Sequence, residues 1–153
     1  PLTSAVKRPL FEARIALRTN APDAQMIADA LPAALQNDAG FVADKALWLR
    51  AGAPAAARGW LAQNRTLTGR PAEVEKWFEL LLSSAREAVT AGDVAAAYRI
   101  ARLVDETYAP GTQVRDRPIG ERDDYTSLVW LAGWNALKTG RAAEAVGMFE
   151  RYG

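Results

Sequence analysis

The sequence predicts an all-α fold of antiparallel helical hairpins, and three observations carry that prediction. Alanine, the strongest helix former, occupies 32 of the 153 positions. β-branched residues never form the alternating runs expected of strands, whereas Gly, Pro, Asn and Asp recur at intervals that suit helix ends. Half of the residues are hydrophobic, which is enough for a core of its own. We therefore expect one α-helical domain over residues 1–153.

Residues that favour helix ends place the individual helices. Asp38 and Asp93 can accept backbone N–H groups as N-caps, and Pro54 and Pro71 suit a first helical position. A polar loop, residues 108–123, interrupts the helical pattern and is much longer than the other connections. The expected helical segments are 8–20, 21–36, 39–52, 54–64, 71–92 and 94–107, followed by a final hairpin over 127–153.

The expected turns are at Asn20, Gly52, Gly92 and Gly140, and small residues recur at fixed distances from them, although Lys45 and Trp48 occupy the two positions before Gly52. Counted from the turn residue, the small residues are seven and four positions before it and five positions after it. An apolar residue follows nine positions after it. Around Gly92 and Gly140 the positions hold Ala85, Ala88, Ala97 and Ala101, and Gly133, Ala136, Ala145 and Phe149. The first hairpin fits loosely, because Gln25 and Asp29 are polar. Small residues at these positions let two antiparallel helices approach closely.

This spacing resembles the tetratricopeptide hairpin, although the turns lie 32, 40 and 48 residues apart instead of at one constant interval. We therefore expect irregular tetratricopeptide-like hairpins stacked in a superhelix, so that each hairpin contacts its neighbours in the chain. A plain helical bundle with glycine stops is the alternative.

Three stretches share further residue patterns with a known family. Residues 42–62 read VADKALWLRAGAPAAARGWLA, residues 97–106 read AYRIARLVDE, and residues 130–152 read WLAGWNALKTGRAAEAVGMFERY. Together they resemble the α-superhelical part of the soluble lytic murein transglycosylases. In that family the superhelix precedes a lysozyme-like domain, which cleaves the glycan strands of peptidoglycan in the periplasm and leaves a 1,6-anhydro sugar.

The resemblance implies a periplasmic, non-catalytic segment that positions the substrate or the catalytic domain. Its partners would be peptidoglycan or a lysozyme-like domain of the same chain, and residues 1–153 would be a fragment of a longer lytic transglycosylase. The family's catalytic acid is a Glu followed by Ser, and none of the nine glutamates here precedes a serine. No catalytic residue is therefore carried over. The alternative function is a tetratricopeptide-like adaptor that binds a protein partner.

Composition excludes several kinds of chemistry. The chain has neither Cys nor His, so thiolate and imidazole metal sites and a Ser-His-Asp triad are excluded, and no cofactor or metal is expected. A net charge of +1 argues against nucleic acid as the main ligand. No apolar run reaches the roughly 18 residues of a membrane span. The adjacent Asp123 and Asp124 are better explained as the acidic start of a helix than as a glycosidase pair.

The candidate ligand-binding residues are Arg115, Arg117 and Arg122 of the polar loop and Trp134 in the helix after it. Arginines could reach carboxylates on peptidoglycan stem peptides or on a partner, and a tryptophan next to them could stack on a sugar. The alternative is an ordered surface loop with internal pairs between arginine and aspartate.

The other tryptophans are expected to fill the spaces between hairpins. Large aromatic side chains bury much apolar area there, so Trp48, Trp60 and Trp77 are assigned to the core. Trp134 could also belong to the core.

Overall fold

The computed structural model describes residues 4–151, and regular structure in this range is helical apart from one isolated bridge between Asp38 and Thr68. The all-α prediction is confirmed. The ends of the predicted domain, residues 1–3 and 152–153, lie outside the described residues. The α-helices are α1 (Ser4–Arg18), α2 (Ala24–Asp29), α3 (Ala39–Gly52), α4 (Pro54–Leu61), α5 (Val74–Thr90), α6 (Val94–Ala101), α7 (Ile119–Lys138) and α8 (Ala142–Glu150). Short 3-10 helices cover Ala33–Leu35, Arg102–Glu106 and Val114–Asp116.

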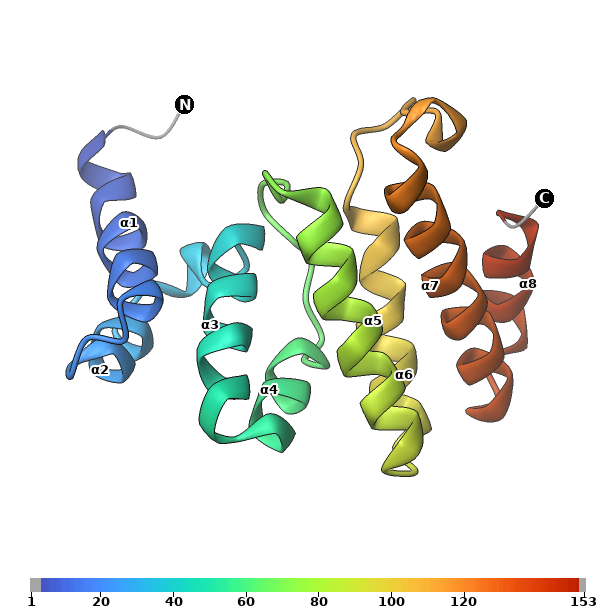
Figure 1. The fold of residues 1–153 in the computed structure, drawn as a ribbon, viewed down its shortest axis with the longest axis horizontal. Coiled ribbons are helices and arrows are strands. Elements are labelled where there is room, and N and C mark those ends of the chain that lie inside the picture. The colour runs from blue at the N-terminus through green and yellow to red at the C-terminus, as the bar shows by residue number, and fades with distance from the viewer. Residues whose placement is uncertain (1–3, 152–153) are drawn as a thin grey trace.

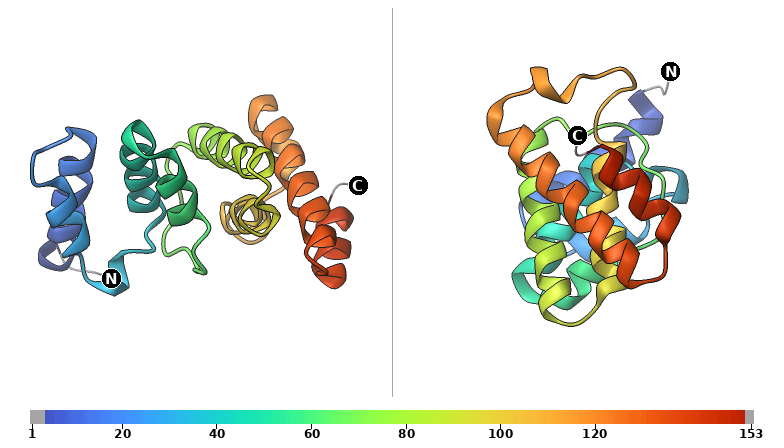
Figure 2. Two further views of the ribbon diagram at one scale, coloured as in Figure 1. Left: turned by 90° about the horizontal axis from the view of Figure 1, so that it is seen from below. Right: turned by 90° about the vertical axis from the view of Figure 1, so that its right-hand side faces the viewer.

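Consecutive helices pack together in pairs, α1 with α2, α3 with α4, α5 with α6, and α7 with α8. The hairpins follow one another in chain order across the molecule, from the first at one end to the last at the other (Figure 1). Helix α7 packs on both α5 and α6, so the last hairpin covers the third. The left view in Figure 2 shows the α1–α2 and α7–α8 hairpins at opposite ends of the row.

Three of the four predicted turn residues take the left-handed backbone conformation that ends a helix. Asn20, Gly92 and Gly140 have φ values of 51°, 80° and 77°. Gly52 differs, because it remains within the last turn of α3. The chain reverses instead at Ala53, with φ −147° and ψ 76°, directly before the proline that begins α4.

The small residues that the spacing singled out lie between the paired helices. Ala85, Ala88, Ala97 and Ala101 are fully buried between α5 and α6. In the last hairpin, a Cβ atom added to Gly133 would lie 2.5 Å from Cε1 of Phe149, so the glycine permits a close approach of α7 and α8. In the first hairpin the buried positions fall one residue earlier than Gln25 and Asp29, at Ala24 and Ala28.

Several helix boundaries differ from the expected ones. Helix α2 ends at Asp29 because Pro32 disfavours a helical conformation in the residue before it. Helix α7 begins at Ile119 rather than after residue 123, so Arg122 belongs to the helix and the polar loop is shorter than predicted. Pro118 stands at its N-cap position with φ −52°.

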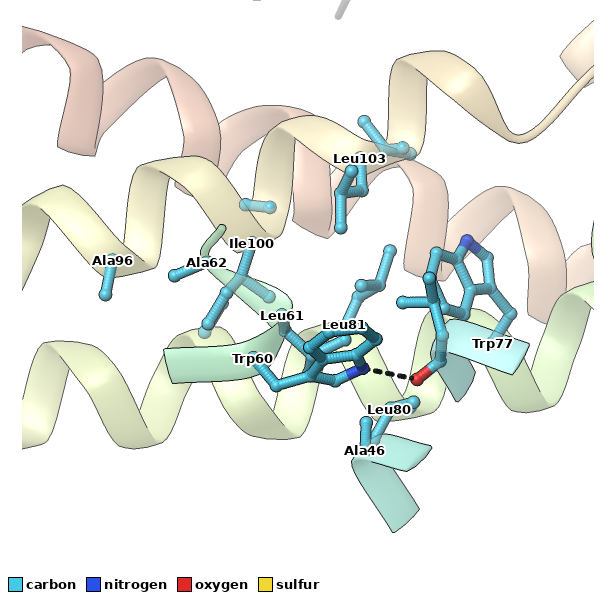
Figure 3. Close-up of a cluster of buried hydrophobic side chains, with 14 of the residues drawn as sticks. Ala46, Trp60, Leu61, Ala62, Trp77, Leu80, Leu81, Ala96, Ile100 and Leu103 are labelled. Atoms are coloured by element: carbon cyan, nitrogen blue, oxygen red, sulfur yellow. Dashed lines mark hydrogen bonds between the residues drawn. The ribbon is translucent and has the colours of Figure 1, made fainter. Parts of the chain in front are cut away.

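The middle of the row holds a well-packed core between α3, α4, α5 and α6 (Figure 3). Trp60 is 7% exposed, and its Nε1 donates to the Val42 carbonyl oxygen at 3.0 Å, the dashed line in Figure 3. Trp77 is 2% exposed and donates to Thr107 Oγ1 at 3.0 Å. Both core assignments are confirmed. Trp48 is only partly buried, with its Nε1 donating to the side chain of the turn residue Asn20 at 3.0 Å.

Two kinds of contact join the first three hairpins. The buried carboxylate of Asp44 on α3 accepts hydrogen bonds from Nε of Arg14, at 2.8 Å, and of Arg18, at 3.1 Å, both on α1. Residues 62–73, which connect α4 to α5, run back past the start of α3. In this segment the Thr68 amide donates to the Asn37 carbonyl at 2.9 Å.

The same connecting segment also reaches the third hairpin. The Leu67 amide donates to Glu106 Oε1, beyond α6, at 2.8 Å. Nearby, the guanidinium of Arg65 lies 4.2 Å from the Trp60 ring, and burial lowers the pKa of Arg65 to about 10, opposed by the negative charge of Glu106. Segment 62–73 therefore links the second hairpin to the third through its backbone amides, which donate to the Asn37 carbonyl on one side and to the Glu106 carboxylate on the other.

Candidate functional site

The structure places Arg117 in a hydrogen-bonded network at the start of α7. Its Nε and Nη2 donate to the two carboxylate oxygens of Glu121 at 3.0 and 3.2 Å. The Tyr108 hydroxyl donates to Glu121 Oε1 at 2.8 Å, and the Arg117 guanidinium lies 5.5 Å from the Tyr108 ring. The alternative interpretation predicted pairs between arginine and aspartate within the loop, but the partner of Arg117 is a glutamate in the first turn of α7.

This network holds all three groups in their ordinary charge states near neutral pH. Burial favours a higher pKa for Glu121, but the hydrogen bonds from Arg117 and Tyr108 outweigh it and lower the pKa. The hydrogen bonds that Arg117 donates to Glu121 raise the pKa of Arg117. Burial, and then the adjacent Glu121, raise the pKa of Tyr108. The hydrogen bonds of Arg117 and Tyr108 to Glu121 fasten the polar loop to α7.

The other two loop arginines lie at the same end of α7 and away from Trp134. Arg115 is exposed, and Arg122 Nη1 donates to its carbonyl oxygen at 3.4 Å. Trp134 follows Arg122 by twelve residues in one continuous helix, which corresponds to about 18 Å along the axis. The structure therefore does not bring the loop arginines and Trp134 into one site.

Trp134 instead belongs to an aromatic cluster on the last hairpin. Its ring centroid lies 5.5 Å from that of Trp130 and 5.8 Å from that of Phe149, and the rings meet edge to face. Trp130 is 43% exposed and Trp134 44%, so neither is a core residue. Two exposed aliphatic side chains, Leu137 on α7 and Val146 on α8, extend the cluster at helical spacing. These five residues are called the terminal aromatic face below.

The acidic residues of α5 and α7 gather where these helices meet. Burial, and then the negative charges of Glu79 and Glu75, raise the pKa of Asp124, while Arg86 opposes the shift. Asp123 is exposed. Within residues 4–151, no group of three or more carboxylates is arranged to hold a metal ion, and no helix is long and apolar enough to cross a membrane.

Sequence reasoning missed a second surface, on the second helices of the middle hairpins. Arg58 on α4, Arg99 and Arg102 at α6 and Arg141 before α8 line one cavity of about 970 Å³. The sequence does show arginines in the second helix of two consecutive hairpins, α4 and α6. The sequence could not show that they face the same cavity, because that depends on the packing of α4 against α6.

Comparisons with known proteins add no relative. Searches with protein-family models, against curated proteins and against solved structures each gave no match to this chain. Its function is therefore inferred from its own surfaces, of which the terminal aromatic face and the arginine-lined cavity are the most distinctive.

Proposed function

We propose that the chain is a non-catalytic segment in which irregular tetratricopeptide-like hairpins form a superhelix and hold a neighbouring helical domain against the terminal aromatic face. The single observation that supports this most is the exposure of Trp134, Leu137 and Val146 together on the last hairpin. Exposed apolar side chains gathered on one face mark interaction sites.

The packing inside the row supports a helical occupant. Helix α7 covers α5 and α6 with a buried apolar stripe that includes Leu128, Val129 and Ala132. A further helical element would cover α7 and α8 in the same way, continuing an interface that already repeats along the chain.

The chemistry of the face also favours a helix over a glycan. The rings of Trp130, Trp134 and Phe149 are inclined to one another by 57° to 78°, so they form ridges instead of a flat platform for a sugar ring. Leu137 and Val146 cannot hydrogen-bond to sugar hydroxyls. Interdigitating ridges and grooves are, by contrast, how helices pack.

In our proposal the parent protein is a soluble lytic transglycosylase-like protein that acts on peptidoglycan in the periplasm. The occupant of the face is then its lysozyme-like catalytic domain. Support comes from the resemblance of residues 42–62, 97–106 and 130–152 to the superhelix of that family, and from the lack of His, Cys or a Glu-Ser pair in this chain. A tetratricopeptide-like adaptor is the second candidate function, and the arginine-lined cavity favours it.

The test measures association of the purified chain with a purified lysozyme-like lytic transglycosylase domain by isothermal titration calorimetry. We expect binding that is lost when Trp134→Glu and Leu137→Glu are combined, because charges would be buried in the interface. Ile119→Glu is the matched control, since Ile119 is an exposed apolar residue at the other end of α7. The chain alone should release no anhydro-muropeptides from sacculi.

The outcomes separate the two candidates. No association with the catalytic domain, or equal effects of the double variant and the Ile119 variant, would contradict the transglycosylase proposal and leave the adaptor. Binding of the chain alone to sacculi that depends on Trp134 would instead make the face a glycan site.

A further inference from the structure

A cavity beside the middle hairpins is lined by none of the five residues of the terminal aromatic face. Its volume is about 970 Å³, and it lies between α4, the turn before α6, α6 itself and the turn before α8. The lining is strongly one-sided in charge, with Arg58, Arg99, Arg102 and Arg141 against the single carboxylate of Asp93. A chain with a net charge of +1 thus concentrates positive charge in one place.

The Asp93 carboxylate in the lining already accepts a hydrogen bond from the backbone. Asp93 is the N-cap of α6, and its Oδ1 accepts from the Ala96 amide at 3.0 Å. Its remaining negative charge also sits at the helix N-terminus, where the helix dipole holds it. Asp93 can offset one of the four arginine charges, and the lining keeps an excess of positive charge.

Two of the arginines have partial partners at the edges of the cavity. Arg58 is 3.8 Å from Glu87, which also pairs with Arg50. Arg102 is 3.4 Å from Glu106 and donates to the Arg65 carbonyl at 3.2 Å.

The other two arginines are available to a ligand. Arg99 and Arg141 are exposed, and in the part of the chain that the structure describes neither has a carboxylate within ion-pair distance. The Arg141 guanidinium is held 5.0 Å from the ring of buried Tyr98, a cation–π contact that leaves its N–H groups free to donate. A guanidinium whose N–H groups are free can bind a carboxylate or a phosphate through two parallel hydrogen bonds.

We propose that this cavity binds an acidic peptide segment. The volume is at the upper end of the range of ligand sites, which is too large for a single small anion and suitable for a few peptide residues. Gln63 and Asn64 contribute side-chain amides to the lining, and an amide offers both the donor and the acceptor that a peptide bond needs. Carboxylates of the peptide pair with Arg99 and Arg141, while the amides bind its backbone.

The same surroundings disfavour nucleic acid. Glu87 and Glu106 stand beside Arg58 and Arg102 and repel a continuous line of phosphates. The aromatic residue of the lining, Tyr98, is 7% exposed and covered by Arg141, so it offers bases no stacking surface. The inference goes beyond the proposed function and does not depend on it, since none of the five residues of the terminal aromatic face lines the cavity.

The test measures fluorescence anisotropy of a labelled short peptide of alternating glutamate and alanine, with the same peptide carrying glutamine as the uncharged probe. We expect the glutamate peptide to bind more tightly, and added salt to weaken its binding. Combining Arg99→Ala with Arg141→Ala should weaken binding about tenfold or more, as expected for the loss of charge-assisted hydrogen bonds.

Combined Lys7→Ala and Arg8→Ala is the matched control, because it removes the same charge from exposed positions on α1. It should leave the affinity nearly unchanged. If the double arginine variant melts early, Arg99→Ala alone gives the answer, since Arg99 has no contact with the Tyr98 ring comparable to that of Arg141. Equal binding of the glutamate and glutamine peptides, equal losses in the arginine and control variants, or tighter binding of a short single-stranded DNA would each overturn the proposal.

Discussion

The two middle hairpins and the two end hairpins are built alike but differ in what they expose. Helices α3 to α6 leave only Leu47 among their large hydrophobic side chains exposed, within the described residues. The end hairpins expose eight: Phe11, Ile15, Met26, Ile119, Trp130, Trp134, Leu137 and Val146. A hairpin inside the row is covered on both sides, whereas an end hairpin is covered on one. The number of exposed apolar side chains thus depends on the position of a hairpin in the row. A partner bound at an end would bury the apolar side chains that are exposed there.

The largest effect should come from truncating the core of a middle hairpin. Phe78 on α5 is fully buried, so Phe78→Ala should lower the free energy of unfolding by about 3–5 kcal/mol. Leu137→Ala, at an end, should change it by less than about 0.5 kcal/mol. Urea denaturation of both variants measures this difference. Comparable losses would mean that the end face is as well covered as the middle, for instance by self-association.

Enlarging a glycine tests how closely the last hairpin is packed. Gly133→Leu should lower the free energy of unfolding by about 1–3 kcal/mol, because its side chain meets the Phe149 ring. Gly59→Ala in α4 is the contrast, since nothing lies within 4 Å of the added Cβ and stability should rise by about 0.4–1 kcal/mol. Combining Gly133→Leu with Phe149→Ala should give a smaller loss than the sum of the two single variants. Strict additivity would show that the two residues do not meet.

Side-chain capping differs between two helices of the middle hairpins, α3 and α6, and helix α2 of the first hairpin. Asp38 and Asp93 accept backbone N–H groups at 3.0 Å at the starts of α3 and α6, and Asp38→Ala or Asp93→Ala should each cost about 1 kcal/mol. Asp23, at the start of α2, makes no such bond with its side chain. Asp23→Ala should therefore leave the thermal midpoint nearly unchanged, and a midpoint as low as that of the Asp38 variant would contradict this distinction.

The smallest effects concern two carboxylates where α7 meets the third hairpin, and they have opposite signs. The pKa of Asp124 is raised, so its ionisation opposes folding and Asp124→Asn should stabilise slightly at neutral pH, by less than about 0.5 kcal/mol after solvent screening. This gain should vanish as the pH falls below the ordinary range of aspartate. The pKa of Glu121 is lowered, so its contribution is present above the ordinary pKa of glutamate and lost as pH falls through the folded-state pKa.

Glu121→Gln should accordingly destabilise at neutral pH and approach wild-type stability in acid. Urea denaturation of both variants at a series of pH values measures the two trends. Parallel curves for the Asp124 and Glu121 variants would show that the two carboxylates share one environment.

Local features of the fold were predictable because each depends on nearby residues. The left-handed conformation at Gly92 and Gly140 and the caps at Asp38 and Asp93 follow from short-range chemistry. The burial of Ala85 between paired helices follows from spacing alone.

What the sequence could not predict depends on packing between hairpins. Whether Trp134 lies in a core or on a surface is decided by what covers α7. The pairing of Arg117 with Glu121 was obscured because the helix was expected to start later, so the two residues were not placed one turn apart. The cavity lined by Arg58, Arg99 and Arg141 exists only once three hairpins are assembled.

The contacts at each joint between neighbouring hairpins differ in how strongly they depend on salt. The joint between the first two hairpins includes Asp44 with Arg14 and Arg18, whose side chains are 32% and 59% exposed, so dissolved ions reach this attraction and weaken it. The next joint also contains charged groups, since Arg50 and Arg58 pair with Glu87, but it encloses the buried core of Figure 3, which added salt does not weaken. Ionic strength should therefore loosen the first joint more than the second, and the position of the first hairpin should depend on the surrounding salt.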